Sequence, residues 1–247
     1  MKFSSRYQNN IKNFIFSKWG LSNSSRRTKY VKKWLESIKD NETILDAGAG
    51  PQQYKKYTGH LKYTSQDFGL YEGGDEFGDT YINHQEKSFN SKTCDIISDI
   101  TNIPREDSSF QNIICTEVFE HLPNPMAALK EFSRLLKNGG KLMITAPFRC
   151  LYHQTPYFFY SGFSKYWYEY HAKEYGFEVY DITPNGNYFE DIAQEVFRII
   201  SLGNVYKKIF SIIFSLPYLI YLFLIDRIFK TKGPESCWGY HVILIKK

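Results

Sequence analysis

The segment from Ile44 to Pro51 constrains the fold more than any other part of the sequence, because an apolar run leads directly into two glycines. The run is typical of a buried strand, and Gly48 and Gly50 allow the backbone to turn sharply and to present N–H groups to a ligand. A dinucleotide-binding turn requires a third glycine where this chain has Gln53, and no Gly-Lys-Ser/Thr follows for a triphosphate. The turn therefore indicates a nucleotide-like ligand and argues against an NAD-dependent oxidoreductase.

Short β-rich runs alternate with helical stretches after this turn. The predicted strands are Thr43–Asp46, Leu61–Asp67, Cys94–Ser98, Asn112–Thr116, Lys141–Ala146, Phe177–Thr183 and His241–Ile245, the last extending back to Trp238. Helices are predicted over Thr28–Lys39 and Met126–Leu136, and a third is predicted between an N-cap at Ser164 and a stop at Gly176. This alternation predicts an α/β fold with a doubly wound, parallel, seven-stranded sheet, whose ligand lies at the carboxyl ends of the strands.

The same pattern divides the chain into four segments. We expect a basic N-terminal helical extension (1–40), a ligand-binding core (41–184), a helical apolar insertion (185–236) and the last strand of the core sheet (237–247). The four cysteines form no C-x-x-C pair, and no apolar signal region follows the first lysine. Both observations favour a reducing, cytoplasmic location.

Positive charge concentrates near the N-terminus. Residues 1–40 contain ten Lys or Arg against Glu36 and Asp40, whereas the whole chain has a net charge of +5. Such a segment is typical of contact with an anionic partner such as a phospholipid surface, and equally of a solvated helix face. Aromatic residues make up 18% of the chain but are spread along its length, which argues against a nucleic-acid partner.

The insertion contains Ile209–Ile225, 17 positions without a charged residue. Pro217 in its middle predicts a bend, and a single membrane crossing would separate the last strand from its sheet. We therefore expect a bent helical pair that lies in a membrane interface, covers the site as an apolar lid, or forms a dimer face. Burial against the body of the protein is the fourth alternative.

Acidic residues end three successive predicted strands. Asp46 ends the first strand, Asp67 the second, and Asp99 follows the third. Clustered carboxylates suit a ligand with positive charge and free sugar hydroxyls, and they repel a pyrophosphate. S-adenosylmethionine, a sulfonium with an adenosine and an amino-acid tail, has these properties.

These motifs resemble those of class I S-adenosylmethionine-dependent methyltransferases over about Thr43 to Tyr180 and the last strand. The matching segments, in family order, are Ile44–Gly50, Asp67, Asp99–Pro104, Phe110–Leu122 and Leu135–Leu142. The chain departs from the family at Gln52, where many members have a third glycine, and at Gln111, where an aspartate is usual. The resemblance implies a Rossmann-like methyltransferase fold, S-adenosyl-L-methionine as cofactor and cofactor contacts from Asp46, Gly48, Gly50, Asp67, Asp99, Ile100 and Glu117.

Two histidines lie just beyond predicted strands, at the expected ligand-binding edge. His121 follows the fourth strand and His153 the fifth, and either could accept a proton from a hydroxyl acceptor. A structural hydrogen bond is the alternative role for His121. The segment from His153 to Tyr160 resembles a loop of methyltransferases encoded with glycan-assembly enzymes, which implies His153 as base or acceptor contact and Tyr157 and Tyr160 as substrate contacts that shape the pocket. Methyl transfer requires no metal, and none is expected.

The sequence thus predicts an S-adenosylmethionine-dependent methyltransferase. The acceptor we expect is the oxygen of a sugar or a lipid-linked glycan at the cytoplasmic membrane face, with peripheral membrane contact through 1–40 and 209–230. Two alternatives remain: a methyltransferase for quinone-like or phenol-like small molecules, and a non-catalytic binding module on the same fold.

Overall fold

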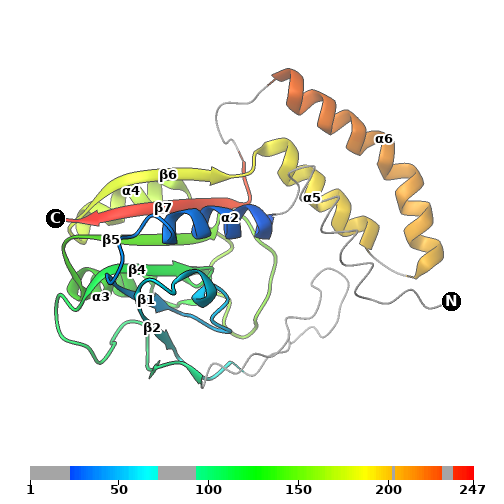
Figure 1. Cartoon of the computed structure of the whole chain (residues 1–247). Coiled ribbons are helices and arrows are strands. Elements are labelled where there is room, and N and C mark those ends of the chain that lie inside the picture. Colours follow the sequence, from blue (N-terminus) through cyan, green and yellow to red (C-terminus); the bar gives the residue numbers. More distant parts are fainter. Residues whose placement is uncertain (1–22, 72–92, 202–203, 230–235) are drawn as a thin grey trace.

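The computed structural model describes residues 23–71, 93–201, 204–229 and 236–247 (Figure 1). The strands are β1 (Thr43–Ala47), β2 (Lys62–Asp67), β3 (Ile96–Ile97), β4 (Phe110–Thr116), β5 (Leu136–Pro147), β6 (Phe177–Asn185) and β7 (Gly239–Lys246). The α-helices are α2 (Asn23–Leu35), α3 (Pro125–Leu135), α4 (Lys165–Glu174), α5 (Tyr188–Ser201) and α6 (Val205–Phe229). Residues 1–22 of the predicted basic N-terminal extension (1–40), including its basic residues up to Lys18, lie outside the described residues.

The seven strands form one sheet in the order β3-β2-β1-β4-β5-β7-β6. This order confirms the predicted doubly wound α/β fold, but β7 is antiparallel to both of its neighbours, so the prediction of an all-parallel sheet is wrong. Gly239 begins β7 opposite Pro147 and Asn185, which end β5 and β6. The chain therefore re-enters the sheet at the edge from which it left, and the strand must run in the opposite direction.

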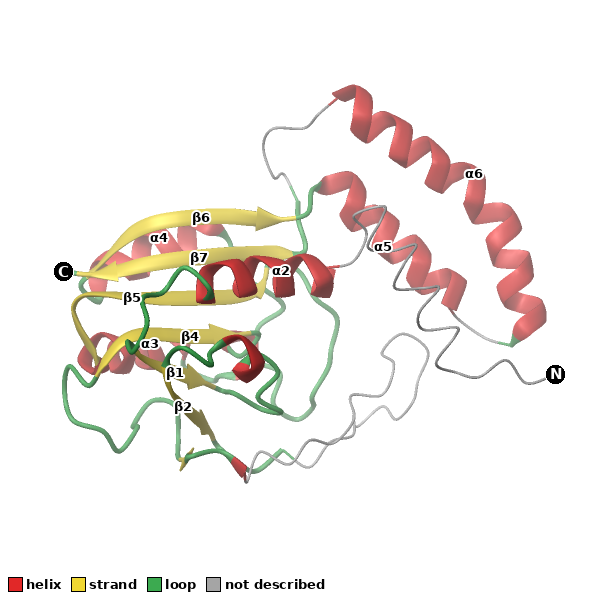
Figure 2. Ribbon diagram, in the orientation of Figure 1, coloured by secondary structure: helices red, strands yellow, loops and turns green. Residues whose placement is uncertain are grey.

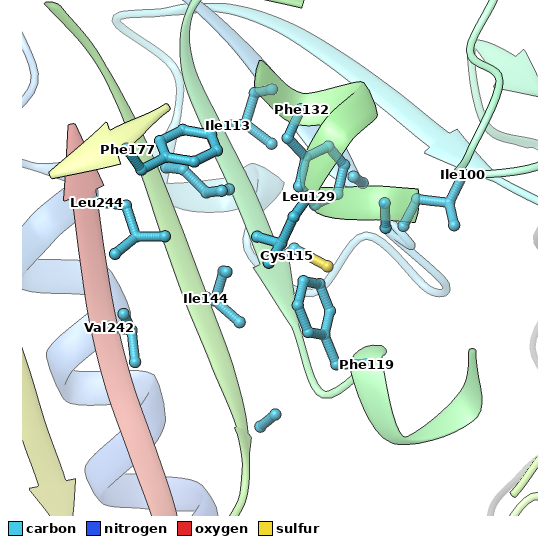
Figure 3. Close-up of a cluster of buried hydrophobic side chains, with 14 of the residues drawn as sticks. Ile100, Ile113, Cys115, Phe119, Leu129, Phe132, Ile144, Phe177, Val242 and Leu244 are labelled. Atoms are coloured by element: carbon cyan, nitrogen blue, oxygen red, sulfur yellow. The ribbon is translucent and has the colours of Figure 1, made fainter. Parts of the chain in front are cut away.

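Helices cover both faces of the sheet (Figures 1 and 2). On one face, α3 and α4 pack over a cluster that includes Phe119, Leu129, Phe132 and Phe177, all at most 1% exposed (Figure 3). On the other face lies α2, which buries Val31, Trp34 and Leu35 against Ile44, Ile114, Met143 and Ile243. Because α2 shares this core, it is a structural layer of the fold although it belongs to the N-terminal segment that the sequence sets apart.

Local hydrogen bonds and backbone conformation explain the start of α3 and both ends of α4. Asn124 accepts from the N–H of Ala127 before α3, and Ser164 accepts from the N–H of Trp167 before α4, as an N-cap does. Gly176 follows α4 with φ of +80°, a left-handed conformation typical of a helix stop. These observations confirm the predicted cap at Ser164 and stop at Gly176.

The insertion folds as two helices that pack along each other. Leu219 and Leu222 of α6 pack with Ala193 of α5. Helix α6 is a single element that runs through Pro217, so the predicted break of this apolar segment into a bent pair is wrong; α5 supplies the second helix. By length and composition alone, one helix in the described part of the chain, Val205–Ile228, is long and apolar enough to cross a membrane.

Ion pairs fasten α5 to the body of the protein. Arg26 of α2 donates to the Glu190 carboxylate over 2.9 Å, and Arg149 after β5 donates to Asp191 over 2.9 Å. Glu190 and Asp191 lie in the first turn of α5, where negative charge is favoured by the helix dipole. The insertion is therefore attached through its first helix, while α6 packs on α5.

A buried histidine joins α2 to the last strand. The ring of Tyr30 stacks on His241 at a centroid distance of 4.3 Å, and its hydroxyl donates to Asp181 of β6 over 2.6 Å. His241 is 3% exposed, and among the described residues its ring nitrogens have no hydrogen-bond partner. Burial, reinforced by the positive charge of Arg27 and opposed by Asp181, lowers the pKa of His241 to about 4.

We expect His241→Phe to alter the pH dependence of stability. Because the pKa of His241 is lower in the folded protein, the unfolded chain binds more protons at acid pH, so the wild type loses stability as pH falls from about 6.5 to about 4. The phenylalanine variant lacks this loss, which amounts to about 3 kcal/mol. Urea unfolding of both proteins across this range measures it. A difference between the two proteins that does not change with pH would contradict the assignment.

Candidate active site

The glycine turn follows β1 and has the sharp geometry that the sequence predicts. Gly48 and Gly50 have φ of +70° and +48°, which favour glycine, and a Cβ on Gly48 would collide with Val118. The N–H of Gly50 donates to Asp67 over 3.0 Å, and that of Gly48 donates to the Gln66 side chain over 3.2 Å. The turn is therefore held by two side chains from the end of β2.

Asp67 is positioned by backbone N–H groups on both of its oxygens. Oδ2 accepts from Gly50 and Oδ1 from Gly69, each over 3.0 Å, and the residue is 4% exposed. Each carboxylate oxygen can accept a second hydrogen bond, so the group can still bind a ligand hydroxyl. The neighbouring Gln66 donates to the carbonyl of Ser98 over 2.7 Å and so links the first and third loops.

The third loop begins with Asp99, as predicted. Its Oδ1 accepts from the N–H and the hydroxyl of Thr101, over 2.8 and 2.7 Å. This local turn fixes the loop and leaves Oδ2 for a ligand. Ile100 lies between the two residues and is 6% exposed.

The three loops open into one cavity of about 710 Å³ at the carboxyl edge of the sheet. Eight of the predicted site residues line it: Gly48, Gly50, Asp67, Asp99, Ile100, Glu117, His121 and Tyr157. Asp46, His153 and Tyr160 do not line it. Arg27 and Gln66 also line the cavity, although no pattern in the sequence indicates a site role for either residue.

Asp46 lies outside the cavity lining because its carboxylate is directed to the neighbouring strand. It is 2% exposed and accepts the hydroxyl of Tyr63 on β2 over 2.7 Å. Burial, with a smaller contribution from the charge of Asp67, raises the pKa of Asp46 to about 6, while the hydrogen bond from Tyr63 opposes the rise. The structure thus gives the Asp46 carboxylate a contact with the neighbouring strand, and its predicted contact with the cofactor stays a prediction.

Arg27 and Glu117 form an ion pair at the cavity wall, 2.6 Å between the guanidinium and the carboxylate. Glu117 has φ of +53° and is held by its N–H to the carbonyl of Thr145 and by the Thr145 hydroxyl, over 2.7 and 3.0 Å. The negative charge of Glu117 contributes to a raised pKa of Arg27, against the opposing effect of burial. The N-terminal helix α2 therefore supplies one wall of the cavity.

The two predicted histidines lie next to each other, with ring centroids 4.7 Å apart. His121 contacts the cavity, and its Nδ1 lies 2.6 Å from the carbonyl of Tyr157. The Nδ1 of His153 lies 2.8 Å from the carbonyl of Leu151. The structure thus brings the pair together, and of the two rings only that of His121 lines the cavity.

The two predicted tyrosines differ in their placement. Tyr157 lines the cavity and contacts the ring of Phe68 edge-on, at 5.1 Å between centroids. The ring of Tyr160 packs against Phe163, and its hydroxyl reaches the carbonyl of Pro123 over 3.5 Å. Tyr157 is therefore placed to touch a ligand, whereas Tyr160 supports the loop.

Residues 45–144 match the family model described as "Methyltransferase domain". This part of the chain is therefore similar to methyltransferase domains. The topology, with an antiparallel seventh strand between the fifth and sixth, is typical of the methyltransferase Rossmann-like fold. A geranyl diphosphate C-methyltransferase from Streptomyces coelicolor shares this fold, with a TM-score of 0.54 at 11% identity over 90% of this chain and 76% of that chain.

Curated relatives match shorter parts of the chain. An uncharacterised protein of Methanocaldococcus jannaschii is 40% identical over 58 residues, 24% of this chain and 25% of its own length. A ubiquinone biosynthesis O-methyltransferase of Xanthomonas oryzae is 42% identical over 40 residues, 16% of this chain and 17% of its own. The chain therefore spans a quarter or less of the curated relatives it matches.

The residues of the methyltransferase domain fit S-adenosylmethionine. The turn at Gly48 has no room for a side chain, which allows backbone approach to a ligand, and the volume lies in the range of about 300–1,000 Å³ common for small-molecule sites. Among the described residues that line the cavity, the carboxylates Asp67, Asp99 and Glu117 outnumber the one cation, Arg27, so the wall favours a positively charged ligand. Asp67 and Asp99 would hold the adenosine part.

We expect Arg27→Met to lower the free energy of unfolding by about 1–2 kcal/mol, because the half-buried Glu117 carboxylate then lacks its cation. Adding Glu117→Gln to that variant should recover part of the loss. Urea unfolding of the wild type, both single variants and the double variant measures the coupling. If the effects of the two substitutions on the free energy of unfolding are strictly additive, the ion pair contributes nothing to stability.

Proposed function

We propose that the chain transfers a methyl group from S-adenosylmethionine to a hydroxyl oxygen of a sugar or lipid-linked glycan at the cytoplasmic membrane face. The observation that carries the proposal is one cavity with two chemically different ends. The glycine turn, Asp67 and Asp99 line one end, and His121 lies at the other. The loop from His153 to Tyr160, whose sequence suggests a glycan acceptor, borders the histidine end.

When bound, the cofactor supplies an electrophilic methyl group. The glycine turn and Asp67 bind and orient its adenosine part, and the acidic wall favours its sulfonium charge. Tyr157 and Phe159 border the space left for the acceptor. The histidine pair at this end assists the loss of the acceptor's hydroxyl proton.

Titration calorimetry with S-adenosylmethionine and S-adenosylhomocysteine tests the cofactor site. We expect binding to the wild type and a loss of at least about tenfold in Asp67→Asn, because an amide group cannot replace both accepting oxygens. Asp107→Asn is the matched control, since the Asp107 side chain is 76% exposed and pairs with Arg134. If neither compound binds while a nucleotide does, the proposed reaction is wrong.

The exposed surface of α6 supports a location at the membrane. Its exposed apolar and aromatic side chains include Val205, Tyr206, Ile209, Phe210, Ile212, Ile213, Phe214, Leu216, Tyr218, Ile220, Tyr221, Phe223, Leu224 and Ile228. Only 11% of the most apolar stretch of this helix is buried. The basic residues Lys207, Lys208 and Arg227 lie near its ends. Apolar and aromatic side chains with basic flanks suit the interface of an anionic bilayer.

The pairing of β7 in the sheet favours peripheral membrane contact of α6 over a membrane crossing. β7 follows α6 and pairs along its length with β5 and β6, which precede α6. If α6 crossed a bilayer, its two ends would lie on opposite sides, although both must connect to the same sheet. We therefore propose that α6 lies along the interface.

Flotation with vesicles of phosphatidylcholine and phosphatidylglycerol tests this contact. We expect the wild type to float at low salt and the double variant Phe210→Glu, Phe214→Glu to remain soluble, because charged groups are excluded from the apolar layer. The matched control is Tyr166→Glu with Tyr170→Glu, two aromatic residues of α4 with similar exposure. A wild type that stays wholly in the soluble fraction refutes membrane docking.

A small-molecule quinone or phenol is the second acceptor class. It is supported by the local similarity to the ubiquinone biosynthesis O-methyltransferase. Transfer of labelled methyl groups to a lipid extract, compared with transfer to soluble phenols, distinguishes the two classes.

A further inference from the structure

We propose that Glu120, His121 and His153 together bind one divalent transition-metal ion at the histidine end of the cavity. The site departs from the sequence-based expectation that no metal is involved. Its existence rests on the geometry of the three side chains, and its role in activating an acceptor rests on the proposed function.

The ligand atoms face one another at metal-binding spacing. Glu120 Oε1 lies 3.8 Å from the Nε2 of His121 and 3.9 Å from the Nε2 of His153, and all three lie within 4.8 Å of one another. Ligand atoms about 2.1 Å from a zinc-like ion lie about 3.4 Å apart in tetrahedral geometry. Small side-chain rotations would therefore close the three atoms on an ion.

The same distances do not suit direct bonds between the carboxylate and the rings. Hydrogen bonds between nitrogen and oxygen span about 2.7–3.2 Å, and 3.8–3.9 Å is too long. The Glu120 side chain is nevertheless 1% exposed, and the two imidazoles are only 10% and 19% exposed. A buried carboxylate with two imidazoles directed to the same oxygen is the arrangement that a shared cation stabilises.

Backbone carbonyls determine which ring nitrogen is available in each histidine. A carbonyl only accepts hydrogen bonds, so the Nδ1 of His121 must donate to Tyr157 and the Nδ1 of His153 to Leu151. In neutral imidazoles this places the proton on Nδ1 and leaves a lone pair on Nε2. Metal-bound histidines are commonly oriented by a carbonyl in this way.

Two rigid attachments hold the three side chains in place. Glu120 and His121 belong to the short 3-10 turn Phe119–His121 after β4, anchored by the fully buried Phe119. The carbonyl of Glu120 accepts the N–H groups of Phe159 and Tyr160, over 2.9 and 3.2 Å. These bonds fasten the loop that carries His153 to the turn that carries the other two ligands.

The donor set indicates the kind of ion and what it does. Two imidazoles and one carboxylate favour Zn²⁺, Fe²⁺, Co²⁺ or Mn²⁺ over Mg²⁺ or Ca²⁺, and they leave coordination positions open. Because His121 lines the cavity, an open position there can take an acceptor hydroxyl. Binding to the ion lowers the pKa of that hydroxyl, and its proton passes to solvent water.

Titration of the EDTA-treated full chain with Co²⁺, followed by visible absorption, tests the site. We expect one equivalent to bind with ligand-field bands and without a thiolate charge-transfer band. His153→Gln should weaken binding by more than the about 10- to 100-fold typical of outer-shell partners, because a direct ligand is lost. Glu120→Gln should do the same. The matched control His171→Gln, which replaces a histidine of α4 that pairs with Glu174 and not with the three proposed ligands, should bind as the wild type does.

Thermal unfolding and S-adenosylhomocysteine binding establish that each variant is folded. If Glu120→Gln does not fold, the more exposed His153→Gln decides the question. The proposal is overturned if Co²⁺ does not saturate a site, if His153→Gln binds as tightly as the wild type, or if a thiolate band shows that cysteine holds the ion. A chain that binds the adenosyl compound but no metal contradicts this proposal alone, and the reverse result contradicts the proposed function alone.

Discussion

The insertion of the last strand, β7, between β5 and β6 is the constraint on which the rest of the structure depends. Gly239 must lie beside Pro147 and Asn185, so everything between β6 and β7 leaves and re-enters at the carboxyl edge. The cavity opens at that same edge. Sheet pairing therefore places the apolar helix α6 and the ligand site on one side of the molecule, without requiring direct contact between them.

Hydrogen bonding between loops has a comparable role inside the cavity. Asp67 holds Gly50, and Gln66 holds both Gly48 and the loop at Ser98. Two consecutive residues at the end of one strand therefore position the loops that follow three strands. The preorganisation of the adenosine end depends on this short segment of β2 more than on the glycine turn alone.

The sequence predicts those features whose cause is local. The turn at Gly48, the N-cap at Ser164 and the stop at Gly176 follow from backbone conformation and nearby donors, and all three are observed. The sequence does not indicate that Arg27 belongs to the site, because Arg27 is one of several basic residues on the same helix. Only the packing of α2 brings it to Glu117. The approach of His153 to Glu120 likewise depends on the path of the loop after β5, which no pattern in the sequence predicts.

Adjacent arginines on α2 serve two separate regions. Arg26 holds the first turn of α5, and Arg27 holds Glu117 at the ligand site. The unit that matches the family model, residues 45–144, lacks this helix as well as β6 and β7. Expressed by itself, that unit would expose the sheet face that α2 covers and would lack the cavity wall that Arg27 supplies. A fragment that retains the ligand site must therefore extend well beyond residues 45–144.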